Sequence, residues 1–356
     1  MKVLGIESSC DECAAALVED GKIVLSNVVA TQIPFHAAYN GVVPEIASRK
    51  HTEWISGVVR ESLEKAGIGP DGVDGVAVTS RPGLLGSLLV GLSFAKAFAW
   101  ARNIPFIAVD HMLAHLYASR CQALSADGCQ APEYPFLGLL VSGGHSIICR
   151  VDDFDDITVL GATIDDAVGE AFDKVAKHYG FGYPGGAVID KLAQSGNPGA
   201  FRFPMPNLYK KSPQGTEHNY DLSYSGLKTA VINQLEQFRV GPKPEQAEIA
   251  GNEGANIAAS FQKTAVEILL RSLFRAAEDT CLRTIVAGGG AAANSYLRAR
   301  LTERTDLTCI FPPPELCGDN GAMIAGIGYQ YLSRGQSSPL DVTASARVSG
   351  FKRKYP

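Results

Sequence analysis

The sequence predicts an α/β protein in which one succession of elements, β-β-β-α-β-α-β-α, occurs twice. Short apolar runs bounded by glycine, proline and aspartate alternate with longer stretches that carry apolar residues at helical spacing. The order found before residue 135 returns after it, although the two halves share little sequence identity. The chain has 356 residues, of which 46% are hydrophobic, which is long for one domain and sufficient for two separate cores.

The first copy is expected to occupy residues 1–134. Asp20-Gly21 separates two of its strands, Pro44 opens its first long helix, and Asp110 is a good N-cap for its last helix. We expect strands at 3–7, 13–18, 23–30, 75–79 and 105–109, and helices at 44–63, at 84–100 (largely buried) and from His111 onward.

The second copy is expected at 135–320, with an insertion near 180–255. The remaining segment, 321–356, is expected to pack back on the first lobe. We expect strands at 136–141, 146–151, 157–161, 284–287 and 307–311, and helices at 165–179, at 291–304 and from Asp319, as N-cap, toward Tyr331.

Composition narrows the function classes. The net charge is −5, so no generally basic surface indicates nucleic acid, and such contact would rest on short basic runs such as Lys210-Lys211. The longest apolar stretch, 84–95, is too short to span a bilayer. The eight cysteines are scattered, and Met1-Lys2 leads straight into a strand without a signal peptide. These features predict a cytoplasmic protein with no membrane association.

Two histidines in the first copy are candidate metal ligands. His111 and His115 are separated by one helical turn and therefore lie on one helix face. The positive end of the helix dipole disfavours imidazolium, so we expect both rings in the neutral form that binds metal. The alternative is a pair of ordinary histidines, one at a cap and one half-buried, and the spacing alone does not decide between these interpretations.

Asp319 occupies the matching place in the second copy. Ligands of open α/β sheets bind beyond the carboxyl ends of strands, and both the histidines and Asp319 follow the fifth strand of their copy. If the two lobes face each other across a cleft, His111, His115 and Asp319 would hold one metal and leave positions open for substrate. Asp319 also fits as a plain N-cap, and the two roles are compatible.

Two glycine-rich loops are placed symmetrically in the second copy, and each follows one of its strands. Ser142-Gly143-Gly144 joins two strands, and Gly288-Gly289-Gly290 joins a strand to a helix. Glycines allow backbone N–H groups to approach anionic oxygens closely, so the pair favours a nucleotide ligand. Asp190 is placed to frame a ribose, and Asn294 can hydrogen-bond a base or sugar, although each residue alone is more typical of a structural role.

The combined motifs resemble one family, the tRNA adenosine threonylcarbamoyltransferases, in the bacterial or organellar form. The resemblance runs nearly end to end. It rests on Gly5-Ile6-Glu7-Ser8-Ser9-Cys10-Asp11-Glu12, His111-x-x-x-His115, Val141-Ser142-Gly143-Gly144-His145, Phe172-Asp173-Lys174, Tyr183-Pro184-Gly185-Gly186, Ser225-Gly226-Leu227-Lys228-Thr229-Ala230, Gly288-Gly289-Gly290-x-x-x-Asn294 and Asp319-Asn320. One departure is Cys13, where the family commonly carries threonine.

The resemblance implies a fold, a reaction and a set of partners. The fold is that of duplicated ribonuclease H-like lobes of the actin/Hsp70/sugar-kinase type facing across a cleft. The reaction moves a threonylcarbamoyl group from threonylcarbamoyl-AMP to the exocyclic amine of the adenosine beside the tRNA anticodon. Family members work with a smaller inactive paralogue and a P-loop ATPase, so both partners are expected in a bacterial cytoplasm.

The resemblance also implies residue roles. His111, His115 and Asp319 resemble the ligands of one divalent metal, which is iron in the family, with zinc as the alternative. Asp11 or Glu12 is the candidate proton acceptor. The substrate-binding set resembles Leu140, Val141, Ser142, Gly143, Gly144, Asp173, Gly186, Asp190 and Asn294.

Three rival functions are weaker. A zinc metalloprotease needs a glutamate beside its first histidine, and that position here is Met112. An ATP-dependent kinase of the same fold has no need of histidine ligands, because Mg²⁺ prefers oxygen. A catalytically inactive scaffold predicts a degraded metal site, whereas both histidines and Asp319 are present.

Overall fold

The computed structural model describes residues 1–39, 41–121, 132–208, 210–212, 215–217, 220–240, 248–249, 252–347 and 352–353. The chain forms two compact units. The first comprises Met1–Tyr134, Asp152–Ile157 and Ile310–Lys352, and the second comprises Pro135–Val151, Thr158–Cys309 and Arg353–Pro356. Residues 310–320 thus lie in the first unit, whereas the sequence reading placed them in the second lobe. The physical reason is that the chain leaves the second sheet at residue 310 and leads into a helix packed on the first sheet.

The first sheet has the strand order β3-β2-β1-β4-β5. Its strands are β1 (Lys2–Glu7), β2 (Glu12–Glu19), β3 (Ile23–Thr31), β4 (Gly75–Arg81) and β5 (Phe106–Asp110). β1 is antiparallel to β2 and parallel to β4, and β4 is parallel to β5. The carboxyl ends of β1, β4 and β5 therefore meet at one edge of the sheet, where ligands bind in open α/β folds.

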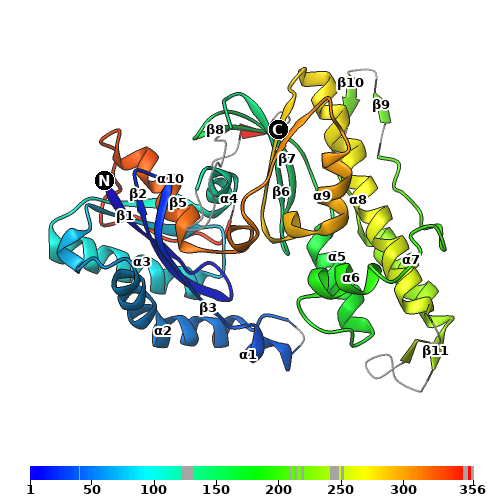
Figure 1. The fold of residues 1–356 in the computed structure, drawn as a ribbon, viewed down its shortest axis with the longest axis horizontal. Coiled ribbons are helices and arrows are strands. Elements are labelled where there is room, and N and C mark those ends of the chain that lie inside the picture. The colour runs from blue at the N-terminus through cyan, green and yellow to red at the C-terminus, as the bar shows by residue number, and fades with distance from the viewer. Residues whose placement is uncertain are drawn as a thin grey trace. The chain divides into compact units, whose positions relative to one another are not determined.

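Helices cover both faces of this sheet (Figure 1). They are α1 (Ile33–Ala37), α2 (Pro44–Lys65), α3 (Leu85–Arg102), α4 (His111–Tyr117) and α10 (Gly321–Leu332), with short 3₁₀ turns at Pro70–Gly72, Ala118–Arg120 and Pro314–Leu316. Leu4 and Ile6 point into the core shared with α2 and α3. Because side chains alternate along a strand, Gly5 faces the opposite side, where α10 packs.

Gly5 sets how closely α10 approaches the sheet. A Cβ on Gly5 would lie 2.2 Å from the Gly321 carbonyl oxygen and 2.4 Å from the Ala325 nitrogen. Only glycine tolerates this contact, so the start of α10 is held directly against β1. Asp319, two residues before the helix, is fixed by the same packing.

The second sheet has the order β14-β13-β6-β7-β8-β15. Its strands are β6 (Phe136–Val141), β7 (Ser146–Asp153), β8 (Asp156–Ala162), β13 (Thr284–Gly288), β14 (Thr308–Ile310) and β15 (Lys352–Arg353). Apart from β15, this order repeats that of the first sheet strand for strand, and β6 is again antiparallel to one neighbour and parallel to the other. The predicted duplication of an α/β fold is confirmed.

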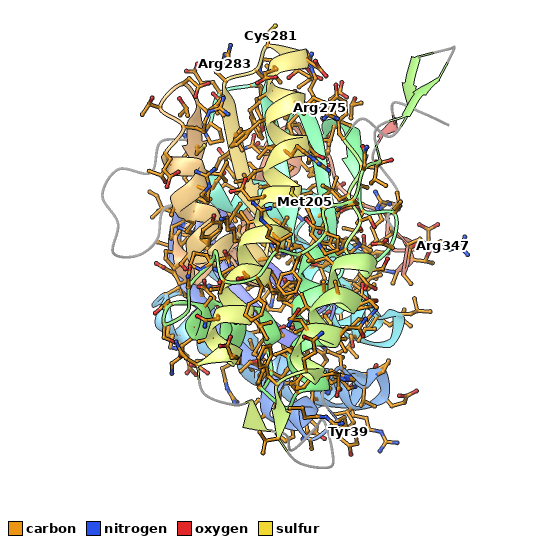
Figure 2. All side chains as sticks on the ribbon, turned by 90° about the vertical axis from the view of Figure 1, so that its right-hand side faces the viewer. Tyr39, Met205, Arg275, Cys281, Arg283 and Arg347 are labelled. Atoms are coloured by element: carbon orange, nitrogen blue, oxygen red, sulfur yellow. The ribbon has the colours of Figure 1, made fainter. Side chains whose placement is uncertain are left out.

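The helices of the second unit include a long one that the sequence reading did not identify. They are α5 (Val168–His178), α6 (Gly185–Ala193), α7 (Ser225–Glu236), α8 (Glu253–Thr280) and α9 (Ser295–Thr302), with a 3₁₀ turn at Gly290–Ala293 and short strands β9 (Lys210–Ser212), β10 (Gly215–Glu217), β11 (Arg239–Val240) and β12 (Glu248–Ile249). The unpredicted α8 packs against α6, α7 and α9. It ends at Cys281, whose φ of 56° is left-handed, and Arg283 follows at the same tip (Figure 2).

Two local expectations were wrong. Helix α3 is not largely buried, because Leu85, Leu89 and Trp100 are exposed, Trp100 to 74%. Helix α5 begins at Val168 rather than Asp165, because the Asp165 carboxylate instead accepts hydrogen bonds from Ser223 and Ser225 next to α7. None of the helices in the described part of the chain combines the length and apolarity needed to cross a bilayer.

Candidate metal centre and nucleotide-binding residues

The two histidines lie side by side on α4 as predicted. The Asp110 carboxylate accepts a hydrogen bond from the Met112 N–H at 2.9 Å and caps the helix. His111 and His115 follow one turn apart, with ring centroids separated by 4.5 Å, and both are buried. The cap at the end of β5 therefore sets the direction in which both rings point.

Asp319 completes the group. Its Oδ1 lies 3.5 Å from Nε2 of His111 and 3.1 Å from Nε2 of His115. The N-cap of α10 is Asn320 and not Asp319, because the Asn320 Oδ1 accepts from the Met323 N–H at 3.0 Å. The expectation that Asp319 caps the helix was therefore wrong. Asp319 belongs to the same unit as the two histidines.

These three side chains suit a divalent metal ion. Within the described residues they form the group whose ligand atoms all lie within 4.8 Å of one another. Both ring nitrogens of His115 are buried without a hydrogen-bond partner, although Nε2 is close to Asp319. Burying an unpaired polar nitrogen is costly, and a cation on Nε2 removes one of the two unsatisfied groups. Two imidazoles and one carboxylate with open positions are typical of non-haem iron and catalytic zinc sites.

Carboxylates control the charge of His111. Burial alone would lower its pKa, but Asp319 and Glu7 together outweigh burial and raise the pKa to about 9. The expected effect of the helix dipole, a neutral His111, is therefore overridden by two nearby negative charges. The same arrangement lowers the pKa of Glu7, because the attraction and hydrogen bond of His111 outweigh its burial.

Asp11 and Glu12 lie in the same unit, at the turn between β1 and β2. Asp11 is buried, and the Glu12 Oε1 accepts a hydrogen bond from the Thr31 hydroxyl at 3.2 Å. Burial raises the pKa of Glu12 to about 10, and the carboxylates of Asp11 and Asp319 add to the effect. Its burial and these two neighbouring carboxylates therefore favour the protonated form of Glu12.

The loop between β6 and β7 carries the first group of predicted substrate-binding residues. Leu140 and Val141 are buried in β6, so only their backbone can meet a ligand. The turn closes through the Ser142 N–H, which donates to the His145 carbonyl at 2.8 Å. Gly143 lies near Asp173, because a Cβ on Gly143 would be 4.0 Å from the Asp173 Oδ2, and Gly144 borders open space.

Asp173 joins this loop to α6. Its Oδ1 accepts from the Gly185 N–H at 2.7 Å, which fixes the start of α6. The next residue, Gly186, has no heavy atom within 4 Å of the place that a Cβ would take. Open space beside a fixed helix start suits the close approach of a ligand.

The triple-glycine loop packs tightly and is not interchangeable with the first loop. Gly289 has φ 92° and ψ 159°, and a Cβ there would lie 2.3 Å from the Val141 carbonyl oxygen. A bulkier residue at Gly289 would therefore strain the loop, whereas Gly144 has room for one. The loop also leads into a 3₁₀ turn, so the helix begins at Ser295, and not at Ala291.

Asp190 and Asn294 belong to one hydrogen-bonded cluster. The Asp190 Oδ1 accepts from the Gln262 Nε2 at 2.6 Å and from the Ser295 hydroxyl at 2.6 Å. The Asn294 Oδ1 caps α9 by accepting from the Leu297 N–H, and it also accepts from Gln262 at 3.2 Å. Gln262 was not predicted because helix α8, which carries it, was not predicted. Nothing in the sequence around Gln262 marks it as a partner of Asp190.

The structure thus brings the predicted residues together in two groups. The metal ligands, Asp11 and Glu12 lie in the first unit, and the whole predicted substrate-binding set lies in the second. The roles of the individual residues stay predictions.

Comparison with known proteins identifies the family. Residues 23–326 match the family model of the tRNA N6-adenosine threonylcarbamoyltransferases (TsaD). The proteins of that name from Treponema denticola and Treponema pallidum are 63% and 53% identical over 99% of this chain, covering 99% and 95% of their own lengths. The protein from Borrelia hermsii is 50% identical over 99% of this chain and 98% of its own.

Solved structures at low identity confirm the fold class. Full-length HypF matches with a TM-score of 0.56 at 14% identity, over 92% of this chain and 54% of that one. Component A of (R)-2-hydroxyglutaryl-CoA dehydratase from Acidaminococcus fermentans matches with a TM-score of 0.51 at 14% identity, over 94% and 99% of the two chains. Both likenesses support the duplicated actin/Hsp70/sugar-kinase type of fold. The chain belongs to the tRNA N6-adenosine threonylcarbamoyltransferase family.

Proposed function

We propose that the protein transfers a threonylcarbamoyl group from threonylcarbamoyl-AMP to the N6 amine of the adenosine beside the anticodon of tRNA, with one divalent metal in its first unit. Family membership at up to 63% identity over the full chain supports the modification of tRNA. The observation that carries the metal is the convergence of His111, His115 and Asp319.

The metal centre uses two Nε2 atoms and one carboxylate oxygen. His111, His115 and Asp319 would hold iron, with zinc as the alternative for the same donor set. Such an ion would supply Lewis-acid stabilisation of developing negative charge. The protein's own contribution is a buried, prearranged set of ligands whose orientation is fixed by Asp110 and by the packing of α10.

The second unit supplies the donor site. The backbone of Ser142, Gly143 and Gly144 offers N–H groups to anionic oxygens, and Gly144 borders open space. Gly186 gives room at the start of α6. Asp190 and Asn294 are held in place by Gln262, so their polar atoms present a fixed arrangement to a ribose or base.

The transfer itself is a substitution at an activated carbonyl. The N6 nitrogen forms a bond to the carbamoyl carbon, the bond from that carbon to the phosphate oxygen breaks, and AMP leaves with the electron pair. The N6 proton must go to a base. Burial and neighbouring carboxylates favour the protonated form of Glu12, which cannot accept a proton, so we assign the acceptor role to Asp11. Because the donor is already activated, orientation of the reactants can supply roughly 7–11 kcal/mol of the barrier reduction.

Partners follow from the same family. We expect a smaller inactive paralogue and a P-loop ATPase to act with this chain, in the bacterial cytoplasm where tRNA is modified. An anticodon-loop base is single-stranded, so it can be offered to the enzyme without opening a duplex.

The test is reconstitution. The protein with its partner proteins, threonine, bicarbonate, ATP and unmodified tRNA should form threonylcarbamoyladenosine, detected by nucleoside mass spectrometry. Asp11→Asn should slow transfer far more than it weakens donor binding, whereas Glu12→Gln, which keeps a neutral hydrogen-bonding group, should be milder. Absence of the nucleoside with active partners would refute the function, and normal turnover by Asp11→Asn would remove only the base.

A further inference from the structure

We propose that Glu7 is a positioning residue that fixes the ring of His111, so that its Nδ1 carries the proton and its Nε2 is presented to the metal. The proposal rests on the metal centre proposed above. Glu7 is the last residue of β1 and is fully buried, and its carboxylate takes no part in the roles assigned so far.

Both oxygens of the Glu7 carboxylate are occupied by donors. Oε1 accepts from the Ser9 N–H at 2.5 Å, and Oε2 accepts from the Thr79 hydroxyl at 2.5 Å. Oε2 also lies 3.0 Å from Nδ1 of His111. Because both carboxylate oxygens already accept from other donors, we infer that Nδ1 of His111 donates in this contact.

This contact leaves Nε2 as the ligand atom. A metal ion would take the place of a proton on Nε2, which faces Asp319 Oδ1 at 3.5 Å, while Nδ1 keeps its proton toward Glu7. A carboxylate behind a histidine also holds the ring orientation and increases its basicity as a ligand. His115 has no such support, because its Nδ1 is buried without a hydrogen-bond partner.

Sheet topology explains how the three residues meet. Glu7, Thr79 and His111 stand at or just beyond the carboxyl ends of β1, β4 and β5, which are adjacent parallel strands. The adjacent strand ends therefore bring the buried Glu7 carboxylate into contact with His111, the first residue of α4. A buried charge is costly unless fully paired, and this carboxylate is paired by neighbours that all belong to the same sheet edge.

The alternative partner of His111 Nδ1 is the Ser9 hydroxyl, which lies 3.3 Å away. The Glu7 contact is shorter and carries charge, and charge-assisted hydrogen bonds are the stronger kind. Removing the hydroxyl with Ser9→Ala leaves the Ser9 N–H bond to Glu7 in place. Ser9→Ala is therefore the matched control for Glu7→Gln.

The experiment measures Zn²⁺ affinity by competition with a chelator, for wild type, Glu7→Gln and Ser9→Ala. Glutamine keeps the size of the side chain and removes its charge. We expect Glu7→Gln to weaken Zn²⁺ binding by roughly 10–100-fold, which is typical for loss of an outer partner of a ligand histidine. Ser9→Ala should change it much less. Equal affinity of Glu7→Gln and wild type would overturn the proposal, as would an equal loss in both variants.

A second readout reports on the ring itself. In protein labelled with ¹⁵N-histidine, the Nδ1–H proton of His111 should appear far downfield and exchange slowly, and Glu7→Gln should move it upfield. A general weakening of the fold does not produce this shift. If wild type bound no Zn²⁺, the metal function would fail, while the same resonance in the metal-free protein would still test Glu7. Should Glu7→Gln not fold, Thr79→Val removes a partner of the carboxylate, and it should reduce Zn²⁺ affinity by a smaller factor; an unchanged affinity there would count against the proposal.

Discussion

Replacing Gly289 with alanine should destabilise the second unit strongly, although the change adds a single methyl group. The backbone at Gly289 has φ 92° and ψ 159°, a region that is nearly exclusive to glycine and costs other residues about 1–3 kcal/mol. The added Cβ would also lie 2.3 Å from the carbonyl oxygen of Val141, and relief of such overpacking typically costs about 1–3 kcal/mol. The sum is about 2–6 kcal/mol in the free energy of unfolding.

The matched control is Gly144→Ala in the other glycine loop. A Cβ on Gly144 has no heavy atom within 4 Å, and its φ is not in the left-handed region, so we expect a change of less than about 0.5 kcal/mol. Calorimetry should show an unfolding transition lowered by roughly 4–24 °C for Gly289→Ala and almost unchanged for Gly144→Ala. Equal transitions in the two variants would refute the strain and the contact with Val141.

Four further predictions concern the cap of α10, a surface carboxylate, adenylate binding and tRNA binding. Asn320→Ala should lower the free energy of unfolding in urea by about 1 kcal/mol, because the α10 cap is lost. It should also weaken Zn²⁺ binding, because Asn320 adjoins Asp319. An unchanged Zn²⁺ affinity would show that the cap does not support the metal centre. Burial acts to raise the pKa of Asp165, but hydrogen bonds from Ser223 and Ser225 lower it overall. The contribution of Asp165 to stability is therefore present above its pKa in the unfolded chain and is lost as the pH falls through its lower pKa in the folded protein. Asp165→Asn should destabilise the protein by roughly 1 kcal/mol at pH 7 after discounting for exposure, and the difference should vanish in acid. Gly144→Val should weaken binding of a non-hydrolysable adenylate analogue in calorimetry without lowering thermal stability, and tRNA binding should weaken steeply with salt despite the net negative charge.

Much of the fold follows from local sequence. Pro44, Asp20-Gly21 and Asp110 mark element boundaries by their own backbone preferences, and the corresponding elements lie within a few residues of the predicted ranges. Helix α8 was not predicted because it adjoins the expected insertion, although Gly251-Asn252 precedes its start. Its N-cap, Asn252, makes no side-chain capping hydrogen bond.

The site was predictable where function depends on local spacing. The histidine pair needed only the helical repeat, and Asp319 was found from its position in the second copy. The sequence analysis assigned Asp319 to the wrong unit. The return of the chain to the first unit depends on the packing of Gly5 against α10, which is a tertiary contact. Glu7 and Gln262 could not be given these roles from spacing. Glu7 meets Thr79 and His111 at separations of 72 and 104 positions, and Gln262 meets Asp190 and Asn294 at separations of 72 and 32.

The metal content of purified variants tests the central claim most directly, namely that His111, His115 and Asp319 hold one metal ion. Elemental analysis of the wild-type protein should find one transition metal per chain. The metal should be lost from His111→Ala and sharply reduced in Asp319→Ala, with circular dichroism unchanged. Stoichiometric metal retained by the double variant His111→Ala/His115→Ala would contradict the account.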